Sequence, residues 1–381
     1  MNVEPARRRI AGGLTIAASL IVPAVCAPTL AAAPVRLVVA DHVAPDGTLG
    51  GPIAIEIDRG TIVSVGTPDE DEPAIAGVLS PGIIDIFSGV GVTGGTRDDI
   101  KPIADDITAM DAIDPLHPSF AEAAAAGITA VMVGPTPSNP VSGLAVTVST
   151  HADGGVLDVL NDESAMVFSL GPPAVDTRYG PTSRAGILFA IRAAMEESGE
   201  DSMLGRVAEA GLPAIVFCPD GDDAAQAIQM MGGFGLSPNI VHSRDALDLS
   251  SDLEDYEGTF IIGPYTFDAR PDVLAGAGFL DRAGVRVVSH GATSNQPYDS
   301  IRMTATLASG YGLAPDAARR SFTSEAAALA GVDDLTGSIR EGFRADLVLW
   351  SGDPLRADVQ PQRVWVYGDL MYQTPAEGSA P

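Results

Sequence analysis

Two patterns of hydrophobic and polar positions divide the chain. Residues 35–79 alternate short β-rich runs with turn residues such as Pro45-Asp46-Gly47 and Asp58-Arg59-Gly60, which predicts a β-meander. Residues 83–330 instead alternate short, wholly apolar runs with helical stretches, the pattern of a parallel sheet covered by helices. After Thr336 the chain returns to strand-like runs at 346–350 and 363–367. We expect these last strands to complete the N-terminal β-domain.

Eight buried strands are predicted in the central segment, at 83–87, 128–133, 145–149, 165–169, 214–218, 239–242, 259–262 and 285–290. Pro118, Ser183 and Pro271 each open a helical stretch that a glycine ends. The third and fourth units are short of helix. The predicted fold is therefore α/β: a (β/α)8 TIM-type barrel over 81–335 with an incomplete helix ring. A small composite β-sandwich domain from 34–80 and 336–374 accompanies it, and 375–381 form a disordered tail.

The first 33 residues have the composition of a signal peptide. Three arginines at positions 7–9 precede an apolar run over 10–25, and small residues follow at 31–33. We expect an exported protein, periplasmic or secreted, with the general and the twin-arginine export routes both open. An uncleaved membrane anchor is the alternative. Cys26 falls in this segment, so the mature chain keeps Cys218 alone and has no intramolecular disulfide.

Charge narrows the range of partners. The 381 residues carry a net charge of −28, and removing residues 1–33, which contribute three arginines and Glu4, leaves the mature chain near −30. Phosphate binding requires clustered Lys and Arg, so a nucleic-acid partner is excluded, as is a membrane partner after signal cleavage. The acidic loop around Lys101, the only lysine, is expected to be solvated.

Three segments carry a resemblance to a known family. They are 79–85 (Leu-Ser-Pro-Gly-Ile-Ile-Asp), 114–143 with its Gly127-Ile128-Thr129-Ala130-Val131, and 337–355 with its Ala345-Asp346-Leu347-Val348-Leu349-Trp350. In this order they resemble the amidohydrolase superfamily, specifically its imidazolonepropionase-like branch. The resemblance implies metal-dependent hydrolysis of carbon–nitrogen bonds other than peptide bonds, at the C-terminal ends of barrel strands.

The metal-binding positions that the resemblance implies are largely lost. The two strand-one histidines fall on Phe87 and Gly89, and the strand-four lysine falls on Val167. A phenylalanine, Phe217, stands on strand five, and Ala292 stands nearest to the strand-eight aspartate. His242 on strand six is retained. Since zinc sites need three or four N, S or O ligands, no metal or other cofactor is expected.

The resulting function hypothesis is a pseudoenzyme with little or no catalysis that binds a small-molecule ligand or a metal-competent paralogue. An alternative is an active hydrolase of cyclic amides or dipeptide-like molecules, with one zinc ion held by candidates His242, His290 and Asp85. A second alternative is an envelope interaction protein. Whether the chain is an enzyme stays open. If the barrel mouth forms a pocket, its predicted residues are Phe87, Asn139, Arg184 and Cys218.

Overall fold

The structure is a computed structural model that describes residues 34–98, 100–199, 201–209, 211–241, 249, 253, 255–291 and 297–375. The predicted signal peptide at 1–33 and most of the predicted tail lie outside the described residues, as do His242 and Ala292. No helix among the described residues is both long and apolar enough to cross a bilayer.

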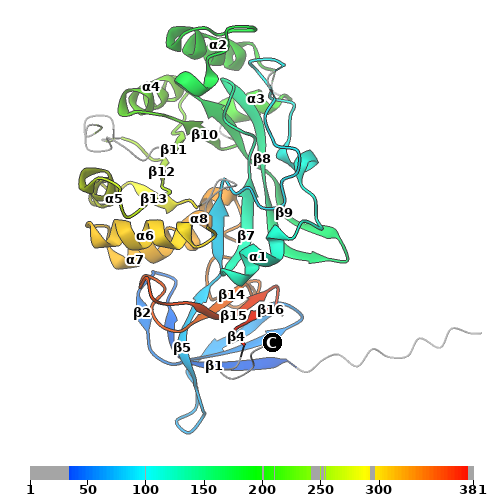
Figure 1. Cartoon of the computed structure of the whole chain (residues 1–381), viewed down its shortest axis with the longest axis vertical. Coiled ribbons are helices and arrows are strands. Elements are labelled where there is room, and N and C mark those ends of the chain that lie inside the picture. Colours follow the sequence, from blue (N-terminus) through cyan, green and yellow to red (C-terminus); the bar gives the residue numbers. More distant parts are fainter. Residues whose placement is uncertain are drawn as a thin grey trace, which may run out of the picture. The chain divides into compact units, whose positions relative to one another are not determined.

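One sheet is built from both ends of the described chain (Figure 1). Its strands are β1 (Val35–Val43), β2 (Leu49–Gly50), β3 (Ile53–Asp58), β4 (Thr61–Gly66), β5 (Ile75–Pro81), β14 (Leu347–Trp350), β15 (Pro361–Val366) and β16 (Asp369–Gln373). Their order is β16-β15-β14-β5-β1-β3-β4, with β2 paired to β1. The predicted small β-domain is thus one continuous sheet, because β14 pairs with β5 and joins the two chain ends.

The second sheet is the barrel, which is nearly closed. Its strands are β6 (Ile83–Ile86), β7 (Ile128–Val133), β8 (Val141–Asp153), β9 (Val156–Ser169), β10 (Ala214–Phe217), β11 (Asn239–Val241), β12 (Thr259–Ile262) and β13 (Arg286–Ser289), in sequence order around the sheet. All eight predicted strands are present. The chain at Ser321 and Phe322 lies between the two ends of the sheet, where its carbonyls accept hydrogen bonds from β13 and β6.

The direction of β8 departs from the all-parallel prediction. This strand is antiparallel to both β7 and β9. A parallel connection needs roughly a dozen residues or more, usually with a helix. Only residues 134–140 join β7 to β8, and the β8–β9 turn is Gly154-Gly155, with φ of 59° and 82°. Positive φ at both central residues is the requirement of a tight hairpin turn that glycine satisfies. The helix ring is therefore incomplete, as predicted, but the missing helices are those after β7 and β8, the second and third units. The fourth unit is not short of helix, because the stretch that Ser183 opens follows β9.

Helices cover the remaining strands. They are the 3₁₀ helices η1 (Ala109–Ala112) and η2 (Pro172–Ala174), and α1 (Ser119–Ala125), α2 (Arg184–Glu197), α3 (Met203–Ala208), α4 (Gly221–Gly232), α5 (Pro271–Arg282), α6 (Ser300–Gly310), α7 (Pro315–Arg320) and α8 (Ser324–Ala330). The predicted helix start at Ser183 is in place, since its side chain accepts from Gly186 N. At the start of α4 Asp220 accepts from Asp223 N at 2.8 Å.

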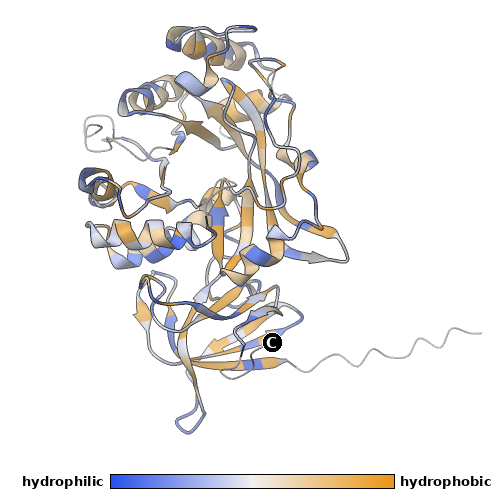
Figure 2. Ribbon diagram, viewed as in Figure 1, coloured by the Kyte–Doolittle hydropathy of each residue, from blue (hydrophilic) through white to orange (hydrophobic). Residues whose placement is uncertain are grey.

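Two apolar layers pack on the barrel sheet. Inside the barrel, side chains such as Ile84, Val167 and Ile261 form one cluster with alanines of α8. Outside it, Ile83, Phe168 and Phe260 pack with the helices. In Figure 2 the barrel strands are accordingly mostly hydrophobic, whereas the helices carry hydrophilic positions among their hydrophobic ones. The alternation along each strand therefore decides which side chains point into the barrel.

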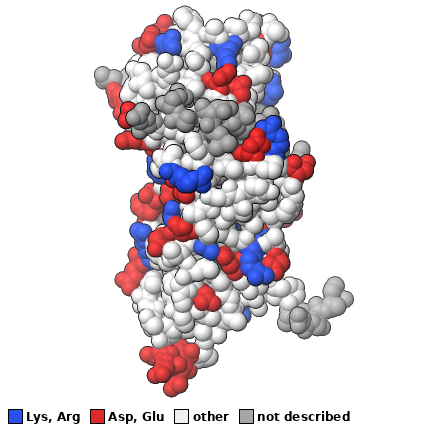
Figure 3. Space-filling view, turned by 90° about the vertical axis from the view of Figure 1, so that its left-hand side faces the viewer, with Lys and Arg blue, Asp and Glu red and all other residues white. Residues whose placement is uncertain are grey.

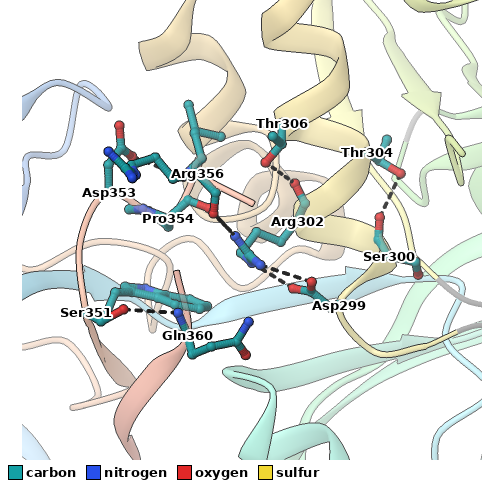
Figure 4. A network of polar contacts seen from close by, with 12 residues as sticks. Asp299, Ser300, Arg302, Thr304, Thr306, Ser351, Asp353, Pro354, Arg356 and Gln360 are labelled. Carbon is teal, nitrogen blue, oxygen red and sulfur yellow. Dashed lines mark hydrogen bonds and ion pairs between the residues drawn. The ribbon is translucent and has the colours of Figure 1, made fainter. Parts of the chain in front are cut away.

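A buried arginine joins α6 to the segment that follows β14 (Figure 4). The side chain of Arg302 is 1% exposed. Its Nη1 donates to the carbonyls of Pro354 and Arg356 at 2.8 and 2.7 Å, while Nε and Nη2 donate to Asp299 at 2.7 and 3.0 Å. The guanidinium also lies 5.6 Å from the ring centroid of Trp350. Nearly all its donors are thus satisfied inside the protein, which makes burial of the charge tolerable.

We predict that Arg302→Met lowers the free energy of unfolding by about 2–4 kcal/mol, because the carbonyls of Pro354 and Arg356 lose their donor and Asp299 loses its cation. Urea unfolding followed by circular dichroism measures this loss. The matched control is Arg356→Met, which removes an exposed side chain paired with Asp358 and should leave the unfolding midpoint nearly unchanged. Equal effects of the two substitutions would contradict the structural role of Arg302.

Candidate active site at the barrel mouth

The candidate site lies at the barrel mouth, which we define as the C-terminal ends of the parallel barrel strands and the loops that follow them. Barrel enzymes place their reacting groups there. Four predicted positions, Phe87, Val167, Phe217 and His290, lie on or directly after strands β6, β9, β10 and β13. The alternation of buried positions then determines which of these side chains point inward.

Two aromatic rings pack against each other at the mouth. The centroids of Phe87 and Phe217 are 4.7 Å apart with the rings at 83°, an edge-to-face contact. Phe87 adopts φ of 60°, a left-handed conformation that is costly for a bulky residue. Gly134 makes room for its ring, since a Cβ there would lie 2.6 Å from Phe87 Cε1. The mouth layer is therefore filled by hydrocarbon where the family resemblance implies metal ligands.

The other two lost positions supply no ligand either. Val167 is fully buried within the inner cluster of the barrel, and Gly89 lies in the loop after β6. Among the described residues, no three His, Cys, Asp or Glu side chains come together as a metal site would require. The donor set of the described mouth does not fit the family's metal.

Asp85 is buried and bonded to the backbone of the opposite end of the sheet. Its Oδ1 accepts from Gly291 N at 2.9 Å. Burial raises the pKa of this carboxyl to about 7, although the hydrogen bonds from Gly291 and Ser88 act in the opposite direction. Asp85 therefore connects β6 to the end of β13, where no strand ladder joins the two among the described residues.

His290 is buried with one ring nitrogen bonded. Its Nε2 lies 2.7 Å from the carbonyl of Gly263, which can only accept, so the proton is on Nε2 and Nδ1 carries the lone pair. Nδ1 has no hydrogen-bond partner among the described groups. Burial lowers the pKa of the imidazole to about 4. His290 is thus a neutral side chain, and two residues before it Val288 belongs to the inner cluster. We infer that His290 also points inward.

Cys218 lies outside the barrel interior. It packs in the outer cluster between strands and helices, because it follows the inward-pointing Phe217. Burial raises the pKa of its thiol well above the ordinary value, with Asp223 adding to the effect, so the thiolate is disfavoured. The structure therefore places this predicted pocket residue in the core.

The two remaining predicted pocket residues hold loops of the mouth together. Arg184, at the start of α2, forms an ion pair with Asp220 at 3.1 Å and contacts the buried carboxylate of Asp223 at the start of α4. Asn139 donates from Nδ2 to the Asp98 carbonyl at 2.6 Å and so joins the β7–β8 connection to the loop after β6. Both have positioning contacts within the chain.

Ser169 was not predicted as a site residue. It ends β9 two residues after the inward-pointing Val167, is fully buried, and its Oγ has no hydrogen-bond partner among the described groups. The period-two alternation was the signal that could have found it. The remaining described histidines have partners within the chain: His42 with Gly51 O, His117 with Ser119, and His151 with Asp369 of β16.

Asp85 and His290 give opposite pH dependences. The native state holds the Asp85 proton up to about pH 7, whereas an unfolded chain releases it near pH 4. The stabilisation of the native state by this proton is therefore present at low pH and is lost as the pH rises from about 4 to 7. The lowered pKa of His290 has the opposite effect on stability. The stabilisation of the native state by the neutral imidazole is present above the ordinary pKa of 6.5 and is lost as the pH falls towards 4.

We predict that Asp85→Asn separates the two effects. Asparagine can still accept from Gly291 N but does not titrate. The free energy of unfolding of the variant, relative to the parent chain, should rise by roughly 2–4 kcal/mol between about pH 4 and pH 7.5. Urea unfolding over this range measures the difference. A difference that does not vary with pH would show that Asp85 ionises normally.

Comparison with known proteins connects this geometry to a family. The model of the amidohydrolase family matches residues 258–376. The curated protein "Amidohydrolase tasK" of Hapsidospora irregularis is 24% identical over 369 residues, and the match covers 80% of this chain. The chain spans 37% of the length of that relative.

Solved structures share the fold. An amidohydrolase from Thermotoga maritima superposes with a TM-score of 0.76 at 22% identity, covering 89% of this chain and all of the other. An adenosine deaminase from Xanthomonas campestris, solved with bound zinc, gives a TM-score of 0.51 at 16% identity and covers 88% and 92% of the two chains. The imidazolonepropionase-like branch stays a prediction. The family model over residues 258–376, the curated relative and the shared fold all make the chain similar to amidohydrolases.

Proposed function

We propose that this chain is an exported amidohydrolase-superfamily protein with little or no hydrolytic activity, which acts by binding a small-molecule ligand or a metal-competent paralogue. The observation that carries the proposal is the packing of Phe87 on Phe217 at the barrel mouth. These rings stand at two of the positions where the family chemistry needs electron-pair donors.

The loss extends over several strands, which supports the proposal more than any single replacement. Val167 occupies the strand-four position, and the only lysine of the chain, Lys101, is paired with Asp106 at 2.5 Å in the loop after β6. A bridging lysine on β9 is therefore excluded by composition. A rebuilt site would have to recruit side chains from other positions.

A rival proposal is a hydrolase with a single zinc ion. The buried lone pair of His290 Nδ1 favours it, because that nitrogen has no partner among the described groups. Against it, Asp85 bonds to the Gly291 amide and lies on the strand between two inward-pointing residues, Ile84 and Ile86. His242, which would have to complete the site, lies outside the described residues.

Export and partner class remain parts of the proposal that rest on the sequence. The basic and apolar segment at 1–33 supports a periplasmic or secreted location. The net charge of −28 disfavours nucleic acid. Acidic side chains are spread over one face of the protein in several patches, with basic ones between them (Figure 3). An envelope interaction protein without a mouth ligand is the further alternative.

We predict that the purified protein contains no stoichiometric zinc, manganese or iron by elemental mass spectrometry. Adding zinc or manganese should not raise the melting temperature, because a metal that binds only the native state would stabilise it. The rival proposal requires one equivalent of metal that is lost in His242→Ala and in His290→Ala. Finding both would establish the hydrolase instead.

We predict that Phe87 and Phe217 are energetically coupled. Phe87→Ala and Phe217→Ala should each lower the free energy of unfolding, and the double variant should lose less than the sum of the two by about 0.5–1.5 kcal/mol. Urea unfolding of the four proteins gives the coupling. Additive losses would mean that the rings do not form one packed layer.

A further inference from the structure

The β8–β9 ribbon has an outer face that lies outside the barrel interior. In a (β/α)8 barrel a helix follows each strand and covers the outer face. Here a direct connection and a hairpin replace two of those helices, so other segments must cover β8 and β9. On one side the chain before η1 does so, with Leu144 N donating to Ile107 O at 2.7 Å. On the other side lies α3.

These two covers leave a groove between them. The β8–β9 groove is a cavity of about 380 Å³ with an apolar part formed by Ile107, Met110, Leu144 and Met203. Leu144 points outward from β8 into the outer cluster, and both methionines are half-buried against that cluster. Methionine side chains are flexible and polarizable, and they adapt to apolar groups of different shape. The groove therefore offers an adaptable apolar surface.

Carboxylates line the same groove. Asp105 and Asp106 lie on the η1 side, and Asp162 and Glu163 lie on β9. Asp106 pairs with Lys101 at 2.5 Å, and Glu163 pairs with Arg206 at 2.6 Å. Asp105 and Asp162 form no ion pair with a described residue, although Asp105 also interacts electrostatically with the Lys101 ammonium. The groove thus combines an apolar part with two carboxylates that can receive cations from outside.

We propose that the β8–β9 groove docks a basic peptide segment of a partner protein. An apolar side chain of the segment lies between Met110 and Met203, and flanking Lys or Arg side chains face Asp105 and Asp162. Burial of the apolar group supplies affinity, while the carboxylates select a cationic partner and speed the encounter. This proposal goes beyond the proposed function and does not depend on whether the barrel mouth hydrolyses anything.

The charge of the chain decides between possible occupants. A second copy would bring a net charge of −28 and further carboxylates to an acidic groove, which opposes self-association. A cationic segment gains from the same field. Its apolar side chain would occupy space that a covering helix fills in a complete barrel.

The test is fluorescence anisotropy of the full chain with a short fluorescein-labelled peptide in which pairs of Lys and Leu alternate, at low salt. We expect saturable binding. Asp105→Lys with Asp162→Lys should weaken it about tenfold or more. The matched control is Glu70→Lys with Asp71→Lys in the exposed β4–β5 turn, which changes the net charge by the same amount. This control should alter the peptide affinity less than about twofold.

A second pair of measurements tests the apolar part. Met203→Gln should weaken peptide binding about threefold or more. If the Met203→Gln variant does not fold, Met110→Gln is measured in its place. A peptide with Gly in place of Leu should bind far more weakly. The proposal would be overturned if both charge-reversal pairs weakened binding equally, if the Gly peptide bound as well as the Leu peptide, or if spermine displaced the peptide fully. A lack of any peptide binding, or self-association of the chain through the groove, would overturn it as well.

Discussion

The interior of a barrel of eight strands has to be filled with side chains, and much of this structure follows from that requirement. Catalytic members of such folds leave polar ligands at the mouth and fill only the layers beneath. In this chain apolar side chains occupy the barrel interior from Val167 to the mouth, where Phe87 and Phe217 pack against each other. Phe87 keeps a left-handed backbone conformation to place its ring there. Strain of this kind persists only where packing compensates for it.

The reversed β8 shows how a local feature reorganises the outside without disturbing the inside. The turn at Gly154-Gly155 and the short connection at 134–140 force the strand to run antiparallel. Inward alternation is preserved, because Ala145 still joins the inner cluster. On the outside, however, two covering helices are lost, and η1 and α3 replace them incompletely. The groove lined by Met110 and Met203 is the physical result.

Much of this could be predicted from sequence, for reasons that are local. Apolar runs located all eight barrel strands, and side-chain caps such as Ser183 located the helix starts. Strand direction was missed, because hydrophobic patterns are the same for both directions, and only the length of the connection carried the answer. The alternation of residues along β9 could have predicted that Ser169 points inward, like Val167. The Oγ of Ser169 and the Nδ1 of His290 are buried without a partner among the described groups. This depends on tertiary packing, which no local sequence pattern encodes.

Asp85 and His290 are two buried titratable groups at this end of the barrel, but of the two only His290 is inferred to point inward. Burial raises the pKa of the Asp85 carboxyl to about 7, so that it is partly protonated at neutral pH, and lowers the pKa of the His290 imidazole to about 4, so that it is neutral there. A neutral imidazole keeps the lone pair with which it can bind a metal ion or accept a proton, whereas a protonated carboxyl can only donate or accept a hydrogen bond. The hydrogen bonds of both groups matter in a buried environment, where an unsatisfied partner is costly. The described mouth therefore combines two phenylalanine rings with one buried acceptor, the Nδ1 of His290, whose hydrogen-bonding capacity the described groups leave unused.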